Sequence, residues 1–212
     1  MSVRFTDEEF TRLKNLLLVY EWGQQIFMTK LNILSQDLRI FQNISPIEHI
    51  KSRIKTPEAI AEKLHRMKVE ITANSAKQYL TDISGFRIIC PFAKDIYGLV
   101  EILTSMPDWK ISMQKDYISN PKPSGYRSYH LIIDLPIYYS GKTEIIPVEV
   151  QIRTAAMDFW STMEHQVRYK YKEHIPKHLS DELIICADKI AELDERMLLI
   201  HEIISLINED SN

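Results

Sequence analysis

The two ends of the chain carry apolar residues at helical spacing, whereas its centre carries the β-branched and aromatic runs that are typical of strands. A capping box from Thr6 to Glu9 predicts a helix that runs to about residue 40. Thr154 predicts the start of a second helix, to about residue 171. A third follows at 180–208. The centre predicts a helix at 95–106, a hairpin turn at 139–142, and strands at 86–92, 110–118, 128–137 and 145–153.

Two further capping patterns precede the first strand. Residues 45–48 form a second capping box with proline at the first helical position, which predicts a short helix. Thr56 and Pro57 predict a helix over 57–71. The layout predicts one α/β (α+β) domain over 1–212, a mixed sheet flanked by helices. We expect an N-terminal helix within 1–44, a core at 45–175 and a C-terminal helix at 180–208.

Composition narrows the classes of function. The chain has 212 residues, and its 45% apolar content suffices for a sizeable core. A net charge of −3 argues against stable binding of duplex nucleic acid. The nearest two of its five glycines, Gly85 and Gly98, are thirteen positions apart. Glycine-rich phosphate loops are therefore excluded, and any nucleotide must be held by side chains or helix ends.

The cysteines, the start of the chain and its apolar runs indicate in which cell compartment the protein lies. Cys90 and Cys186 both lie in apolar runs, and we expect both to be buried thiols in a reducing environment. The acidic start lacks a signal-peptide core, and no apolar run approaches the roughly 18 residues of a membrane span. We therefore expect a cytoplasmic protein without a membrane partner.

The last predicted strand carries the strongest chemical pattern. Side chains alternate along a strand, so Glu149, Gln151 and Arg153 share one face. A carboxylate, an amide and a guanidinium together suit a site, although the solvated outer face of an antiparallel sheet would show the same pattern.

A polar loop precedes the third predicted strand. Lys115, Lys122, Tyr126 and His130 lie in or beside it. Cations neutralise phosphate, and an aromatic ring can stack a base. An ordinary polar turn has a similar composition, so the loop alone does not decide the function.

Cations also lead into the helix predicted at 57–71. Arg53 and Lys55 precede its cap, and Lys63 and Arg66 follow along it. A helix N-terminus attracts anions, so these residues suit phosphate groups. The alternative is a solvated basic helix face.

An acid and an arginine, Asp82 and Arg87, flank a turn at the entrance to the first predicted strand. Asp82 suits a metal or a simple turn. Together with Glu149 it offers the two carboxylates that suit Mg²⁺ beside nucleotide phosphates.

These motifs resemble a known family. Arg53-x-Lys55, Asp82-Ile-Ser-Gly-Phe-Arg87, the loop of residues 115–130 and Glu149-Val-Gln-Ile-Arg153 occur in the order found in the RelA/SpoT synthetases, and specifically in the small alarmone synthetases. The resemblance implies a nucleotidyltransferase-like sheet. It also implies transfer of pyrophosphate from ATP to the ribose 3′-hydroxyl of GDP or GTP, which makes ppGpp or pppGpp and releases AMP.

The resemblance further implies a role for each candidate residue. Glu149 and Asp82 are the expected catalytic residues and ligands of Mg²⁺. The expected ATP contacts are Arg53, Lys55, Lys63, Arg66, Arg87 and His130, and the expected GDP or GTP contacts are Lys115, Lys122, Tyr126, Gln151 and Arg153.

Two positions depart from the family pattern, and two other functions stay open. Ala59 stands where many members carry a phosphate-contacting serine, and Ser124 replaces a common asparagine of the acceptor loop. Because no histidine is followed by aspartate, we expect no hydrolase activity. The alternatives are a tRNA 3′-end pyrophosphokinase and a catalytically silent nucleotide or RNA sensor of the same fold. The apolar stripe of the last helix and the family resemblance predict a homotetramer formed through the terminal helices.

Overall fold

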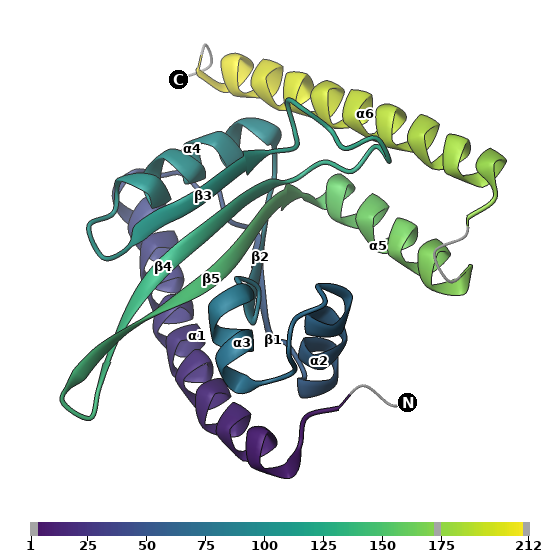
Figure 1. The fold of residues 1–212 in the computed structure, drawn as a ribbon. Helices are drawn as coiled ribbons and strands as arrows, with labels where there is room; N and C mark the ends of the chain where they lie inside the picture. Colours follow the sequence, from purple (N-terminus) through teal and green to yellow (C-terminus); the bar gives the residue numbers. More distant parts are fainter. Residues whose placement is uncertain (1–3, 172–174, 210–212) are drawn as a thin grey trace.

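A five-stranded mixed sheet, ordered β1-β2-β5-β4-β3, forms the centre of the computed structural model, which describes residues 4–171 and 175–209 (Figure 1). The sheet is flanked by helices, as the sequence predicts. The strands are β1 (His49–Ile54), β2 (Ser84–Cys90), β3 (Lys110–Asp116), β4 (Tyr129–Tyr139) and β5 (Lys142–Thr154). The helices are α1 (Asp7–Phe41), α2 (Pro57–Arg66), α3 (Ala73–Tyr79), α4 (Ala93–Ser105), α5 (Ala155–Lys170) and α6 (Lys177–Glu209).

The long helix α1 packs along the sheet and closes the core (Figure 1). Thr6 caps it by accepting a hydrogen bond from the backbone N–H of Glu9, which confirms the predicted start of the helix. The Glu9 carboxylate bonds to Arg12 and to the N–H of Ala73, so it does not complete a capping box. The Phe27 ring lies edge-on to the rings of Phe86 and Trp109, with centroids 4.8 and 5.1 Å away. Burial of such aromatic side chains stabilises the fold by the hydrophobic effect and by ring-to-ring contact.

The hairpin between β4 and β5 lies where the sequence predicts it. Tyr139 pairs with Lys142, and the two residues between them, Ser140 and Gly141, have φ angles of 48° and 76°. Positive φ at both positions gives a turn whose twist matches that of the strands. At its other end, β5 leads directly into α5, which Thr154 caps through the N–H of Met157.

The predicted short helix at 45–48 is wrong. The backbone N–H of Glu48 donates instead to the carbonyl of Ile89, and the chain continues as the edge strand β1, which pairs with β2. The sheet therefore takes a segment that its cap-like sequence assigned to a helix. Strand β1 lies at the edge of the sheet, where charged and polar residues are common. Its sequence, HIKSRI, therefore lacks the apolar alternation of a central strand.

The helix predicted at 57–71 is shorter than expected. It ends at Arg66, because Lys68 adopts a left-handed φ of 58° and the N–H of Val69 bonds back to the carbonyl of Leu64. This arrangement is typical of a helix C-terminus. Helix α3 follows as a separate helix that the sequence analysis did not predict.

The cysteine prediction is half right. Cys90 is buried on β2, but Cys186 is exposed on α6, so the prediction that both are buried is wrong. Its neighbour Ala187 is the buried residue, because successive helical side chains point about 100° apart. Among the described residues no helix is both long and apolar enough to cross a membrane.

Candidate active site

Strand register gathers the predicted site residues on one face of the sheet. Gln151 on β5 lies opposite both His130 on β4 and Arg87 on β2. Glu149 lies opposite Gly85, which in turn pairs with Arg53 on β1. Paired residues on neighbouring strands point to the same face, so an acid, an amide, an imidazole and two guanidinium groups come together.

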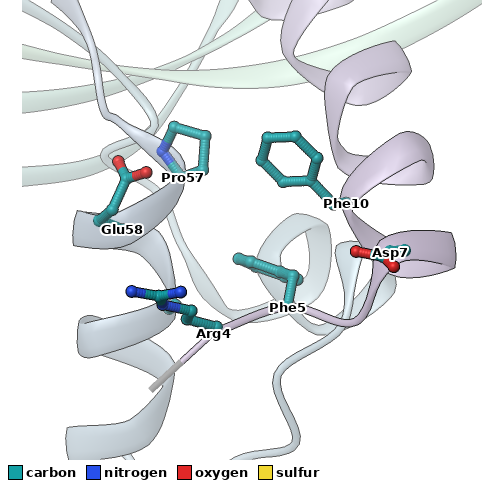
Figure 2. A pocket seen from close by; sticks show the side chains of 7 residues that line it. Arg4, Phe5, Asp7, Phe10, Pro57 and Glu58 are labelled. Carbon is teal, nitrogen blue, oxygen red and sulfur yellow. The ribbon is translucent and has the colours of Figure 1, made fainter. Parts of the chain in front are cut away.

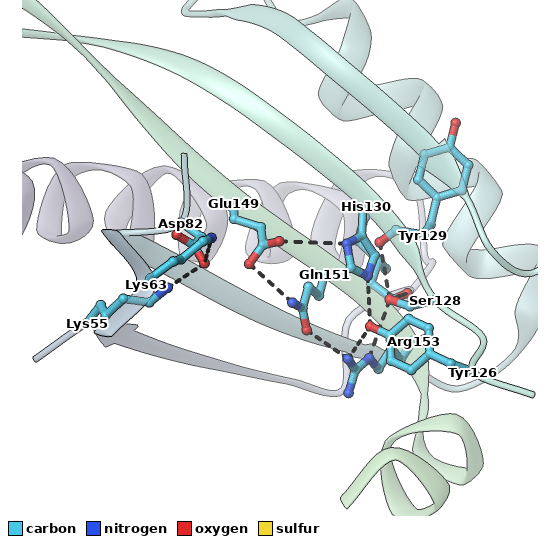
Figure 3. A network of polar contacts seen from close by, with 11 residues as sticks. Lys55, Lys63, Asp82, Tyr126, Ser128, Tyr129, His130, Glu149, Gln151 and Arg153 are labelled. Carbon is cyan, nitrogen blue, oxygen red and sulfur yellow. Dashed lines mark hydrogen bonds and ion pairs between the residues drawn. The ribbon is translucent and has the colours of Figure 1, made fainter. Parts of the chain in front are cut away.

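A chain of polar contacts runs from Glu149 through Arg153 to His130 (Figure 3). Gln151 donates to Glu149 Oε2 over 3.2 Å and accepts from Arg153 over 2.8 Å. Arg153 also donates to the Tyr126 hydroxyl over 2.5 Å, and that hydroxyl lies 2.8 Å from His130 Nε2. The predicted strand face is therefore an ordered network rather than a solvated surface.

Asp158 in the first turn of α5 supplies the counter-charge for this network. Its Oδ1 atom lies 3.1 Å from Arg153 Nη1 and 3.0 Å from Arg87 Nη1. Arg153 is only 3% exposed, so its charge depends on these partners. The sequence analysis missed Asp158. Its one signal was an acid five residues after Arg153, in the first turn of a helix capped by Thr154.

Burial, together with the positive charges of Arg153, Lys122 and Lys115, lowers the pKa of His130 to about 3. The imidazole is therefore neutral at physiological pH. Its Nδ1 atom lies 3.7 Å from Glu149 Oε1, and this contact is then not an ion pair. A neutral imidazole leaves the charge of Glu149 uncompensated on that side.

Two lysines converge on one oxygen of Asp82 (Figure 3). Lys55 Nζ and Lys63 Nζ lie 2.5 and 2.6 Å from Asp82 Oδ2. Burial opposes ionisation of this carboxyl, but the hydrogen bonds from the lysines outweigh it and hold the pKa below its usual range. The second oxygen, Oδ1, is buried and has no hydrogen-bond partner among the described residues. An ionised, half-free carboxylate of this kind fits a divalent cation.

The polar loop places a lysine over two tyrosine rings, one of which belongs to this network. Lys122 Nζ lies 4.6 Å from the ring centroid of Tyr117 and 4.7 Å from that of Tyr126. Arg153 is also close to the Tyr126 ring, with its guanidinium carbon 5.0 Å from the ring centroid. This arrangement suits a ligand with both a planar base and phosphate groups.

Three adjoining cavities of about 280, 500 and 440 Å³ open on this face, and Arg53 lines all of them. The last of these has both carboxylates in its wall. The predicted residues that line it are Arg53, Asp82, Lys122, Tyr126, His130, Glu149 and Gln151. Two candidates do not line these three cavities: Arg66, at the end of α2, and Lys115, on β3. Both are exposed. Lys115 nevertheless lies opposite His130 in the pairing of β3 with β4, at the edge of the same face, so the structure brings most of the candidates together but not Arg66.

Helix α5 lines two of these three cavities. Glu164 lines two of them and forms an ion pair with Arg168, one turn further along α5. The sequence analysis missed both residues, because a Glu and an Arg four positions apart are common on a solvated helix face.

A further cavity, of about 300 Å³, lies between the N-terminal segment and the first turn of α2 (Figure 2). Its walls are the rings of Phe5 and Phe10 and the side chains of Pro57, Glu58 and Asp7, with Arg4 as its cation. With two carboxylates against one guanidinium, it lacks the positive charge that polyphosphates need. The sheet face is therefore the candidate active site.

The pattern described as "Region found in RelA / SpoT proteins" matches residues 52–174, which include the end of β1, the polar loop and β5. The chain belongs to the RelA/SpoT family. This finding confirms the resemblance that the sequence motifs indicated.

Relatives in the family are similar in length and in structure. GTP pyrophosphokinase YwaC of Bacillus subtilis strain 168 is 46% identical over 185 residues, which cover 87% of this chain and 88% of that protein. The crystal structure of small alarmone synthetase 2 from B. subtilis has a TM-score of 0.81 at 44% identity, covering 89% of this chain and 97% of that one. Small alarmone synthetase 1 from B. subtilis, bound to its product pppGpp, has a TM-score of 0.85 at 33% identity, covering 92% and 99%.

Proposed function

We propose that this protein is a GTP pyrophosphokinase that transfers the pyrophosphoryl group of ATP to the ribose 3′-hydroxyl of GDP or GTP. The products are ppGpp or pppGpp and AMP. The observation that carries the proposal is a cavity with the carboxylates of Asp82 and Glu149 in its wall, together with the cations Arg53 and Lys122 and a tyrosine ring suited to a base. A third carboxylate in this wall, that of Glu164, is paired with Arg168. Relatives of nearly the same length are named for this activity.

On the ATP side, Arg53 and Arg87 stand on neighbouring strands and take the adenine between their planar guanidinium groups. Lys55 and Lys63 reach the phosphates from their present position on Asp82. Arg66 and His130 take the places near the transferred group that the family resemblance assigns to them. The neutral state of His130 lets it accept or donate a hydrogen bond without adding charge.

On the acceptor side, the guanine stacks on Tyr126, and Lys115 and Lys122 hold its phosphates. We name residues 117–128 the acceptor loop. Gln151 and Arg153 orient Glu149 and the Tyr126 hydroxyl through the polar network. These two residues therefore fix the positions of side chains that form the acceptor subsite.

The reaction joins the 3′-oxygen of the acceptor to the β-phosphorus of ATP. The bond from that phosphorus to the oxygen it shares with the α-phosphate breaks, and AMP leaves with the bonding electrons. Glu149 takes the proton of the 3′-hydroxyl, because its Oε1 faces a neutral imidazole, which does not compete for the charge of the base. Lys55 and Lys63 offset the charge that develops on the phosphoryl oxygens.

The proposed cofactor is Mg²⁺, which Asp82 and Glu149 would hold. The partnerless Oδ1 of Asp82 and the donor set of two carboxylates fit an ion that completes its shell with water and phosphate oxygens. When bound, Mg²⁺ supplies charge neutralisation at the phosphates and at the attacking hydroxyl.

The proposal includes an assembly and a location. Residues 1–212 act as one synthetase domain, with 45–175 as its catalytic core. The protein forms a homotetramer in the cytoplasm through its terminal helices. The apolar side chains that α6 leaves exposed, among them Leu193, Met197 and Ile204, support an interface there.

The test is incubation of the purified protein with ATP, Mg²⁺ and either GDP or GTP, followed by thin-layer chromatography. The expected result is a guanosine tetra- or pentaphosphate and an equal amount of AMP. A parallel reaction offers tRNA as the acceptor. Transfer to tRNA alone, or nucleotide binding without AMP release, would overturn the proposal in favour of the tRNA-modifying or the sensor function.

A further inference from the structure

The acceptor loop rests directly on helix α6. Gly125 has a φ of 89°, and a β-carbon at this position would lie 2.7 Å from Ala187 Cβ and 3.5 Å from Ile184 Cα. Ala187 is only 3% exposed beneath it. The backbone of the loop therefore touches the helix at the residue immediately before Tyr126.

Arg127, the residue immediately after Tyr126, ties three segments together. Its Nη1 donates to the carbonyl of Ile118 at the beginning of the loop, over 3.2 Å. Its Nη2 donates to Asp188 Oδ1 on α6, over 3.1 Å. One guanidinium thus joins both ends of the loop to the helix, in the forked geometry that lysine lacks.

Helix α6 is itself fixed at two points, once to α5 and once to the end of β5. Trp160 Nε1 on α5 donates to the carbonyl of Leu183, over 2.8 Å. Thr154 at the end of β5 bonds to Asp194 over 2.5 Å. The helix therefore links the strand of Glu149 to the loop of Tyr126.

We infer that Arg127 is a positioning residue for the acceptor nucleotide: it holds Tyr126 in place by anchoring the acceptor loop to Asp188 on α6. This inference rests on the proposed function, because it assumes that Tyr126 stacks on the guanine. It concerns only the acceptor side. Arg127 reaches away from the network, toward α6, whereas Arg53 and Arg87 on the ATP side belong to β1 and β2.

The test compares Arg127→Gln and Asp188→Asn with the wild type, with initial rates at varied ATP and at varied GDP. Arg127→Gln loses the ion pair and weakens the bond to Ile118, so the KM for GDP rises about tenfold or more. Asp188→Asn breaks one exposed pair, so the same KM rises by about two- to fivefold. The KM for ATP stays within about twofold in both variants.

A matched control lies on the same helix. Glu202 on α6 forms an ion pair with Lys94 on α4, over 3.0 Å, far from the acceptor loop along the helix. Glu202→Gln is expected to leave both KM values unchanged. If Arg127→Gln raises the two KM values equally, or no more than Glu202→Gln does, Arg127 does not position the acceptor.

Two further measurements keep the outcomes separate. Melting curves show whether Arg127→Gln folds, and the exposed Asp188→Asn tests the same contact without disturbing the core. Calorimetric titration with GDP measures the Kd without turnover. A wild type that binds GDP but makes no product contradicts the proposed function, and a Kd that both substitutions leave unchanged contradicts the inference about Arg127.

Discussion

Asp158 is the carboxylate that neutralises two arginines of the site, so Asp158→Asn tests how much this pairing stabilises the fold. The substitution keeps the size of the side chain and removes its charge. Arg153, at 3% exposure, then keeps Gln151, Tyr126 and Ser128 as neutral acceptors but loses its only carboxylate among the described residues. Arg87 loses the same partner.

The magnitude follows from burial. Breaking a buried ion pair by removing one charge costs about 3–5 kcal/mol. Because three neutral acceptors remain for Arg153, we expect the lower end, about 3 kcal/mol. For a domain of this size, that loss lowers the Tm by about 6–12 °C.

The assay is a thermal melt of Asp158→Asn beside the wild type, at equal protein concentration. Glu192→Gln is the matched control, because Glu192 and its partner Arg196 form an exposed pair one turn apart on α6. The control should change the free energy of unfolding by less than about 0.5 kcal/mol. If both variants melt together with the wild type, the guanidinium of Arg153 is not buried as described and the network does not hold the site.

Three more predictions concern the substrates and pH. Tyr126→Ala raises the KM for the acceptor about 5- to 150-fold, the worth of one stacked base, with little change for ATP; equal changes would remove Tyr126 from the acceptor subsite. Arg87→Ala weakens ATP instead, and Arg87→Lys does not restore it, because an ammonium group cannot stack as a planar guanidinium does; rescue by lysine would contradict the stacking role. The low pKa of His130 is caused first by burial. Below about pH 6.5 the unfolded chain therefore binds a proton at His130, whereas the folded chain binds it only near pH 3. Stability from His130 is therefore full above pH 6.5 and is lost as the pH falls, and in urea titrations His130→Gln should flatten this decline between pH 6 and 4.

Local patterns in the sequence predicted the elements whose structure depends on local chemistry. The cap at Thr6, the turn at Ser140 and the alternation of Glu149 with its apolar neighbours all follow from propensity and period. Strand β1 and the chain before it were missed, because pairing with β2 overrides a cap-like sequence at residues 45–48. Tertiary pairing of this kind leaves no local signal.

The residues of the candidate site also differ in whether the sequence alone indicates them. Family motifs identified Asp82, Glu149 and Tyr126, which line one cavity. Asp158 and Glu164 lie outside those motifs, on α5, and their importance depends on how that helix crosses the sheet. Only the three-dimensional arrangement reveals that one aspartate serves two arginines.

The central claim is that Glu149 is the base for the ribose hydroxyl. The most direct test is kcat of Glu149→Gln at saturating ATP and GTP across a Mg²⁺ titration, with a melting curve for the variant. We expect a folded protein whose kcat is lower by at least about 10²-fold at every Mg²⁺ concentration, since general-base help contributes that much. Asp82→Asn should lose activity too, but regain part of it at high Mg²⁺. A folded Glu149→Gln protein that keeps more than about a tenth of the wild-type kcat would contradict the account.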